Sequence, residues 1–535
     1  MIRRLLYRPK SAIVGVLGLI AFMSYEWSAF APKANAIPAF ARKYDFTCNV
    51  CHVPGFPKLN DFGNLFRDRG YQLGSDADLP TSDNITMGFW PVSFRTTVGN
   101  QIGSVRAGGA GISTNAVGFT TLDILSFGTL TRDVAFRIVF TGQPSSEFGF
   151  AGATPDLESA AVKLMGLEKY LGIKPAKGDY YFNLLIGKHE LDVPFSEKRS
   201  PTLNTPFVMY HYVPGLPYTS GTLNVTSNFT TINPGYLNPN TFGIGDNQPG
   251  IELTGIKKTN WSKGFFRYTL DALFTNPSTS SPLGPQGGPS SCINGSSRPT
   301  IDQSALACAN GGYNVNFYGH ATQSFGGYGI VTGHRIGIFG MYGHMPTMPN
   351  PTCNDCLGTG GSNAAFSRVG VDVSTTLNGE WNLFGAFMHG NDSKNLFASQ
   401  LANMQNCFAV TLNCGTLGAG GVFGNPGAPQ NASWNGAFVE LDYYPALLPV
   451  LDMPNWFFAY RYDLIRNNRQ GFSNFAGNFN DVDSHTFNIR YFLHQSTRTD
   501  VALHVEFNWY KAKGVSTTGT DLIGQTVFTG VDFAF

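Results

Sequence analysis

The sequence predicts an all-β barrel that spans a membrane, with about 16 antiparallel strands and a small helical segment ahead of the first strand. Three observations predict it. Segments of about ten residues with alternating apolar and polar positions recur through most of the chain. Charged residues make up only 13% of the chain while aromatic residues reach 14%, as expected for an outer face in lipid with aromatic girdles. The chain also ends on an alternating strand that stops at Phe535, a terminal aromatic typical of bacterial outer-membrane barrels.

The alternation separates an apolar face from a face that carries charges. In residues 456–464, aromatic side chains and Leu464 occupy one face, while Arg461 and Asp463 lie on the other. The same pattern occurs in residues 266–274, 368–374 and 501–509. The alternative fold is a soluble β-sandwich or propeller. Charges would be costly in its packed core but suit the wet lumen of a barrel, so the barrel is favoured.

Three regions follow from the composition along the chain. Residues 1–36 are expected to be a signal peptide, with basic residues before an apolar run over 12–23 and a small-x-small cleavage pattern at Ala34 and Ala36. The alternative is a single membrane anchor, which needs an apolar run of about 20 residues. The run over residues 12–23 is shorter than this. Residues 37–84 form a compact segment with short helices expected around 60–70, and residues 85–535 form the barrel.

Long stretches without strand character separate the predicted strands, and long loops belong on the outer side of such barrels. They are residues 196–247, 277–312, 345–363, 391–435 and 467–483. Three of them hold close pairs of cysteines, which predict loop disulfides in an oxidising compartment. The pairs are Cys292 with Cys308, Cys353 with Cys356, and Cys407 with Cys414.

Cys48, Cys51 and His52 form a Cys-x-x-Cys-His motif. This spacing lets two thioether bonds reach the vinyl groups of one haem c, while the adjacent histidine ligates the iron. The alternative is a disulfide with an incidental histidine. Cys353 and Cys356 have the same spacing but are followed by Leu357, so no second haem is predicted.

The sequence does not determine the sixth ligand of the haem iron. Met87 is the first methionine after the motif and is the preferred candidate. His189, His504 or a methionine from a loop are alternatives, although each has a simpler interpretation as a packing or lumen-lining residue.

Residues 38–71 closely resemble the haem segment of the fused cytochrome–porins of the outer membrane, a family that includes the iron oxidases of iron-oxidising bacteria. The large loops and overall size look most like the cytochrome 572 type. Over the rest of the chain the resemblance is architectural, and the cysteine-bearing loops depart from the simplest members. The matching residues are Pro38, Ala39, Phe40, Ala41, Arg42, Cys48, Cys51, His52, Phe56, Pro57, Lys58, Leu59, Asn60, Phe62, Gly63, Phe66, Gly70 and Tyr71.

The resemblance implies an outer-membrane oxidoreductase that takes electrons from Fe(II) outside the cell. A haem inside the barrel would pass them to a periplasmic cytochrome or cupredoxin. Two alternatives stay open: a conduit for another donor or acceptor, and a passive porin whose N-terminal segment is a plug. The net charge of +1 gives no electrostatic case for nucleic acid as a partner. Nothing in the sequence indicates an oligomeric state.

Fe(II) is expected to react by outer-sphere electron transfer, because the sequence suggests no cluster of histidine, cysteine and carboxylate ligands that would hold iron tightly. Acidic residues expected in the lumen have basic neighbours in the sequence that would balance their charge. The acidic residues are Asp271, Asp372, Asp463 and Glu506, and the neighbours are Arg267, Arg368 and Arg461.

Haem attachment through Cys48 and Cys51 can be tested on denatured protein. Because thioether bonds survive denaturation, the wild-type protein should keep its haem on a denaturing gel stained for peroxidase activity. Replacement of both cysteines by Ala should abolish the stain. A stain that persists in the double variant would contradict the assignment.

Overall fold

The computed structural model describes most of the barrel and parts of the segment that precedes it. The described residues are 40, 44, 50–52, 58–73, 92–107, 110–142, 156–176, 179–200, 202, 205–212, 214, 244–245, 247–275, 314–326, 333–346, 363–377, 380–394, 428, 430–445, 455–471, 473, 478–495, 499–514 and 521–534. The predicted signal peptide, Cys48, Met87, Phe535 and the six paired cysteines lie outside them.

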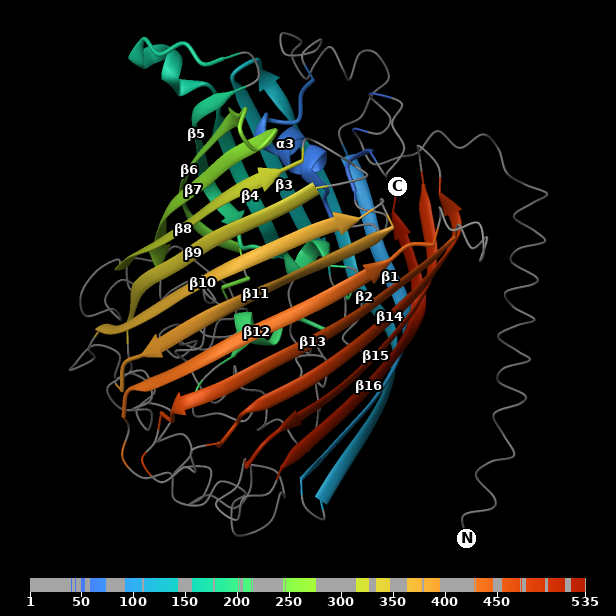
Figure 1. Ribbon diagram of the computed structural model, residues 1–535. Helices are drawn as coiled ribbons and strands as arrows, with labels where there is room; N and C mark the ends of the chain where they lie inside the picture. Colours follow the sequence, from blue (N-terminus) through green and yellow to red (C-terminus); the bar gives the residue numbers. More distant parts are fainter. Residues whose placement is uncertain are drawn as a thin grey trace, which may run out of the picture.

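Sixteen antiparallel strands form one closed barrel, which confirms the predicted fold class (Figure 1). Each strand pairs with its neighbours in the chain, and β1 pairs with β16. The strands are β1 (Val92–Ala107), β2 (Ala110–Thr131), β3 (Val134–Gly142), β4 (Asp156–Leu164), β5 (Tyr180–Glu190), β6 (Asn247–Thr259), β7 (Gly264–Thr275), β8 (Asn314–Phe325), β9 (Gly333–Pro346), β10 (Asn363–Leu377), β11 (Trp381–Asp392), β12 (Ala432–Tyr443), β13 (Trp456–Arg469), β14 (Val482–Gln495), β15 (Asp500–Ala512) and β16 (Leu522–Ala534).

Closure removes the edges of the sheet. The β1–β16 register runs from Arg95 opposite Ala534 to Ala107 opposite Leu522. Backbone groups of a spanning sheet cannot find water in the hydrocarbon core, so only a closed barrel satisfies them all. None of the helices in the described part of the chain is both long and apolar enough to cross a membrane.

The outer face of the barrel is apolar and the inner face is polar, as the alternation predicts. On β10, the side chains of Val369 and Val371 are 60% and 52% exposed, whereas those of Arg368 and Asp372 are 5% and 4% exposed. Large apolar side chains that point outward on many strands form a surface suited to lipid. The barrel is therefore of the membrane-spanning kind.

The connections differ in length at the two ends of the barrel. At one end, short turns join β2 to β3 through residues 132–133 and β6 to β7 through residues 260–263. At the other end, the connections span residues 191–246, 276–313 and 393–431. This is the predicted arrangement of long loops on one side and short turns on the other.

Helix α3 (Asp61–Asp68) occupies the stretch where the sequence predicts short helices. The Asn60 side chain caps its first turn by accepting a hydrogen bond from the Gly63 amide, at 2.8 Å. Gly70 and Tyr71 end it with backbone φ angles of 68° and 63°, in the left-handed region that stops a helix. The Gln72 side chain then donates to the carbonyl of Arg132 in the β2–β3 turn, at 2.9 Å, so α3 enters from the short-turn end (Figure 1).

A second segment fills the lumen from the long-loop side. After β5, the chain forms the short helices η4 (Glu197–Arg199) and α5 (Val208–His211), and α5 contacts β12 and β13. Phe207 and Val208 are fully buried, and Arg461 of β13 donates to the carbonyl of Thr205 at 2.7 Å. The expectation that Arg461 and Asp463 face a wet lumen is wrong, because this segment buries both of them.

The topology predicts which connections antibodies can reach on intact cells. An epitope inserted between β11 and β12, within residues 395–427, should be labelled from outside, because long connections face outward. The matched insertion in the β6–β7 turn, after Trp261, should be labelled only after the outer membrane is permeabilised. The reverse pattern would invert the orientation of the barrel.

Candidate functional site

The described part of the Cys-x-x-Cys-His motif lies just ahead of α3. The backbone of His52 forms an antiparallel bridge with Leu59, and the ring Nδ1 of His52 lies 3.2 Å from the carbonyl oxygen of Lys58. A carbonyl can only accept, so Nδ1 carries a proton and donates it to this carbonyl. This is the usual orientation of a metal-ligating histidine, whose second nitrogen donates to a carbonyl or carboxylate.

Asn60 joins the motif to the helix. Its side-chain nitrogen donates to the carbonyls of Val50 and His52 at 3.1 Å and 3.3 Å, and its backbone amide donates to Cys51 at 3.0 Å. A Cβ atom on Gly63 would lie 2.1 Å from the Cys51 carbonyl oxygen. Only glycine therefore allows α3 to pack this closely on the motif.

The surroundings of Cys51 suit a thioether. Cys51 is half-buried, and burial raises the pKa of its thiol to about 11. The free thiol of Cys51 is therefore protonated and uncharged at neutral pH. A thioether carries no charge, and the residues present therefore fit covalent attachment of haem c.

Aromatic rings connect the motif segment to the barrel wall. The ring of Phe40 lies 5.0 Å from that of Phe66 and stacks on Tyr71 at 5.1 Å. Tyr71 in turn stacks on Phe127 of β2 at 5.3 Å. Phe40, Phe66 and Tyr71 belong to the residues that carry the family resemblance, and the structure brings all three together.

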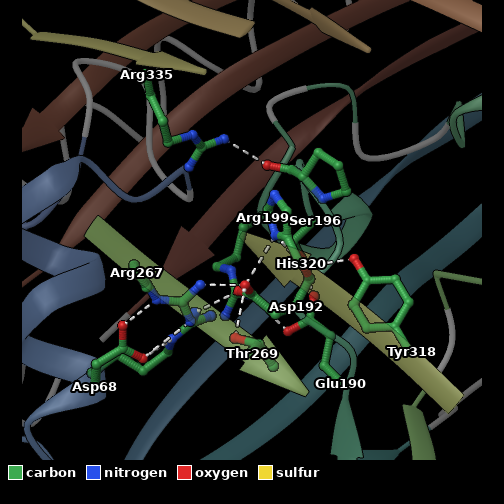
Figure 2. Close-up of polar contacts among 12 residues, drawn as sticks. Asp68, Glu190, Asp192, Ser196, Arg199, Arg267, Thr269, Tyr318, His320 and Arg335 are labelled. Atoms are coloured by element: carbon green, nitrogen blue, oxygen red, sulfur yellow. Dashed lines mark hydrogen bonds and ion pairs between the residues drawn. The ribbon is translucent and has the colours of Figure 1, made fainter. Parts of the chain in front are cut away.

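Arg267 of β7 joins both lumen segments to the barrel (Figure 2). Its guanidinium donates to the carboxylate of Asp68 at the end of α3 and to that of Asp192 just after β5. Arg67 also donates to Asp192, at 3.2 Å. Thr269 adds a hydrogen bond to the same carboxylate at 3.2 Å. One buried arginine therefore links the segment from the short-turn end to the segment from the long-loop end.

The charges around Arg267 set the ionisation of both acids. Burial alone would raise the pKa of Asp192, but Arg267, His320 and Arg67 outweigh it and hold that pKa well below its ordinary value of 3.8. Burial likewise opposes ionisation of Asp68, and Arg267, Lys163 and Arg67 together lower its pKa. Both carboxylates therefore stay charged in acid well below neutral pH.

His320 of β8 extends this network across the lumen. Its Nδ1 lies 2.8 Å from the Asp192 carbonyl oxygen, and its Nε2 lies 3.0 Å from Asp372 of β10. Arg335 of β9 donates to the carbonyl of Pro194 at 2.8 Å (Figure 2). Three strands, β7 to β9, therefore hold the start of the 191–212 segment through direct polar contacts, and Asp372 of β10 supports His320.

Lys58 anchors the other end of the motif segment. Its ammonium donates to Asp442 of β12 at 2.9 Å and lies 3.1 Å from the centre of the Phe384 ring. Burial lowers the pKa of Lys58, and Asp442 and Glu440 oppose this shift. Lys58 and Asn60 also line a cavity of about 100 Å³ between α3 and the 191–212 segment.

Several charge pairings differ from those expected. Arg461 does contact Asp463, at 2.7 Å. Arg267, however, contacts Asp68 and Asp192 rather than Asp271, because two acids from the lumen segments reach it. Arg368 contacts Asp392 at 2.8 Å rather than Asp372. Asp271 and Asp372, which these arginines do not pair with, contact histidines instead. His189 lies 3.0 Å from Asp271, and His320 lies 3.0 Å from Asp372.

The two histidines considered as haem ligands lie in lumen networks. His189 lies on β5 and contacts Asp271, whereas His504 of β15 lies 3.2 Å from both Glu506 and Asp532. The sixth ligand stays a prediction, with Met87 as the preferred residue. His189 also belongs to a cluster with Glu252 and Asp271 whose ligand atoms could hold a metal ion, which the sequence did not suggest.

No motif in the sequence marks Asp68, Asp192 or His320 as a site residue. The positions of two of them were a weak indication, since His320 is a histidine within an alternating strand and Asp192 lies two residues after the end of β5. Their partners come from segments far apart in the chain, which no local pattern reveals.

Comparisons with solved structures find barrels. OprB of Pseudomonas putida is 11% identical, with a TM-score of 0.42, covering 85% of this chain and 96% of that one. An anion-selective porin from Comamonas acidovorans is 11% identical, with a TM-score of 0.40 and coverage of 83% and 99%. The outer-membrane channel DcaP of Acinetobacter baumannii is 9% identical, with a TM-score of 0.38 and coverage of 82% and 96%. No family model and no curated protein matches the chain.

The class of protein rests on the strand pairing and the faces of the barrel. The chain is a closed 16-stranded antiparallel β-barrel of the membrane-spanning kind, and two segments of its own chain are docked within the lumen.

Removal of Arg267 should release α3 from the barrel. In Arg267→Met, Asp68 and Asp192 stay buried without their shared guanidinium, a loss on the order of 3 kcal/mol, or roughly a hundredfold in local opening. Hydrogen exchange of residues 59–73, followed by mass spectrometry, measures this opening. Arg466→Met is the matched control, because the ion pair between Arg466 and Asp483 is more exposed. This variant should leave the hydrogen exchange of α3 unchanged.

The same contact predicts the pH dependence of docking. Because the pKa values of Asp68 and Asp192 are lowered in the folded protein, their contribution is complete above the ordinary value of 3.8 and is lost as the pH falls below it. The protection of α3 amides from hydrogen exchange, corrected for the intrinsic exchange rates, should therefore be the same at pH 7 and at pH 5. Opening that begins near pH 6 would contradict this assignment.

Proposed function

We propose that the protein is an outer-membrane electron-transfer oxidoreductase that oxidises Fe(II) outside the cell and passes the electron to a periplasmic cytochrome or cupredoxin. The observation that carries the proposal is the motif histidine, whose Nδ1 is engaged by the Lys58 carbonyl at the mouth of a membrane barrel. A haem c bound through Cys48 and Cys51 would supply a one-electron Fe(III)/Fe(II) couple there.

The residues around the motif have separate roles in this proposal. His52 would hold the haem iron through Nε2, and the Lys58 carbonyl fixes the orientation of its ring. Asn60 and Gly63 hold the motif backbone against α3. The aromatic rings of Phe66 and Tyr71 pack with Phe40 and join the motif segment to the barrel wall.

The docking of the lumen segments supports a path for electrons across the membrane. Electron tunnelling weakens steeply with distance, so a single redox centre serves both sides only if it lies inside the barrel. The segment that carries His52 enters from the short-turn end, which is the expected periplasmic side. It meets the 191–212 segment from the opposite end at Arg267.

The low pKa of Asp192 supports operation in acid. Fe(III) stays in solution only at low pH, so an iron oxidase benefits from a fold that tolerates acid. Ionised Asp68 and Asp192 keep the two lumen segments attached to Arg267 under those conditions.

A passive porin with an N-terminal plug is the second candidate. The cavity beside α3 favours it, since Arg67, Arg199, Arg267 and Arg335 line a polar space within a porin-like barrel. Such a lining would suit small anions. Conductance of the purified protein in a planar lipid bilayer separates the two candidates, because an electron conduit needs no open pore.

Electron transfer from Fe(II) can be followed by stopped-flow absorbance. Purified ferric protein mixed with excess Fe(II) at acid pH should develop the spectrum of a ferrous c-type cytochrome. His52→Ala should lose this reaction because it removes the axial ligand. His485→Ala, which alters a histidine on the outer face beside Tyr460, is the matched control and should keep the wild-type rate.

Fe(II) reactivity and haem content together decide the proposal. If the ferric protein stays oxidised in excess Fe(II) at every pH tried, iron oxidation is wrong. If the purified protein also carries no haem, the porin candidate replaces it.

A further inference from the structure

Three neighbouring strands bring a histidine and two carboxylates together on the inner wall of the barrel. His189 lies on β5, Glu252 on β6 and Asp271 on β7, and Glu252 and Asp271 are direct cross-strand partners. One ligand atom of each residue lies within 4.8 Å of the other two. The side chains are 0%, 6% and 3% exposed, respectively, so the cluster is removed from water.

The hydrogen bonds of His189 fix which nitrogen faces the acids. Its Nδ1 lies 3.0 Å from the Gly187 carbonyl oxygen. Because a carbonyl only accepts, Nδ1 carries a proton, and Nε2 faces Asp271 Oδ1, 3.0 Å away. An imidazole lone pair and a carboxylate oxygen at this distance need a proton between them, bound to either residue, or a metal ion in its place.

Compensation of the two carboxylates is incomplete. Asp271 Oδ2 is buried with no hydrogen-bond partner, and no hydrogen bond to the Glu252 carboxylate is found among the described residues. Arg267 contacts Asp68 and Asp192 instead, and Lys163, which interacts electrostatically with Glu252, is shared with Asp68 at 3.8 Å. Two buried carboxylates side by side are costly unless a cation neutralises them.

The local backbone is built for this position of His189. Gly187 has a φ of 137°, which side-chain-bearing residues rarely adopt, and a Cβ there would lie 2.2 Å from the Ala160 carbonyl oxygen. Opposite His189 in the β5–β6 register is Gln248. Gln248 is fully buried, and neither polar atom of its amide has a partner.

We propose that His189, Glu252 and Asp271 bind a divalent transition-metal cation of the Mn(II) or Fe(II) class. One imidazole and two carboxylates are ligands that these ions accept. Two ligand atoms at about 2.1 Å from an ion and at right angles are about 3.0 Å apart, which matches the separation of His189 Nε2 and Asp271 Oδ1. The Gly187 carbonyl supplies the outer hydrogen bond that orients a ligating histidine.

The site lies beside the contact that holds the lumen segments. Arg267, Thr269 and Asp271 are consecutive inward positions of β7, and the first two contact Asp192. A bound cation would therefore lie next to the junction of the two lumen segments. This inference does not depend on haem attachment, since it uses only the barrel wall.

Mn(II) titration of the full-length protein without a polyhistidine tag tests the site. The electron paramagnetic resonance signal of free Mn(II) should fall as one ion binds per chain at pH 7. Asp271→Asn and Glu252→Gln, which keep side-chain shape, should each weaken binding at least tenfold, as should His189→Ala. Glu506→Gln alters a different buried histidine–carboxylate contact, that of His504, and should leave the affinity for Mn(II) unchanged.

Each result supports or overturns the proposal. The heat-dependent mobility of the barrel on a gel verifies that each variant folds. Absence of Mn(II) binding to the wild type between pH 5 and pH 8 would show that a proton alone occupies the cluster. Binding that survives all three substitutions, or that falls equally in Glu506→Gln, would place the ion elsewhere. Haem content and Fe(II) reactivity are measured separately, so failure here leaves the proposed function standing.

Discussion

The buried contact of Arg267 with Asp68 and Asp192 is the interaction on which the interior of this protein depends. A barrel of 16 strands is wide enough to leave an aqueous channel, and two segments from opposite ends occupy it instead. Arg267 holds both by one guanidinium. The position of His52 follows from this contact, since Asn60 and α3 connect the motif to Asp68.

The barrel was predictable because its cause is local. A strand with lipid on one side must alternate, so residues 368–374 and 456–464 reveal both the strands and their inner faces. The interior was less predictable because its partners are remote in sequence. Arg267 was expected to balance acidic neighbours in the sequence, but the acids that reach it come from positions 68 and 192. The lumen was expected to be wet, but Arg461 is buried and contacts Thr202, Thr205 and Pro206.

The candidate site divides in the same way. The role of His52 as a haem ligand stays a prediction from three residues at fixed spacing, to which the structure adds the Lys58 carbonyl that orients the ring. The cluster of His189, Glu252 and Asp271 could not be predicted from the sequence, because its members are spread over 83 positions (189 to 271) and meet only through the strand register. His52 and His189 share one device, a backbone carbonyl on Nδ1 that turns Nε2 toward a cation.

The central claim is that electrons cross the membrane through the motif within the barrel. Proteoliposomes that enclose a soluble ferric cytochrome c test it when Fe(II) is added only to the outside. The account predicts that wild-type protein reduces the enclosed cytochrome and that His52→Ala does not. Equal reduction with both proteins would mean that Fe(II) itself enters through an open pore, and would contradict the account.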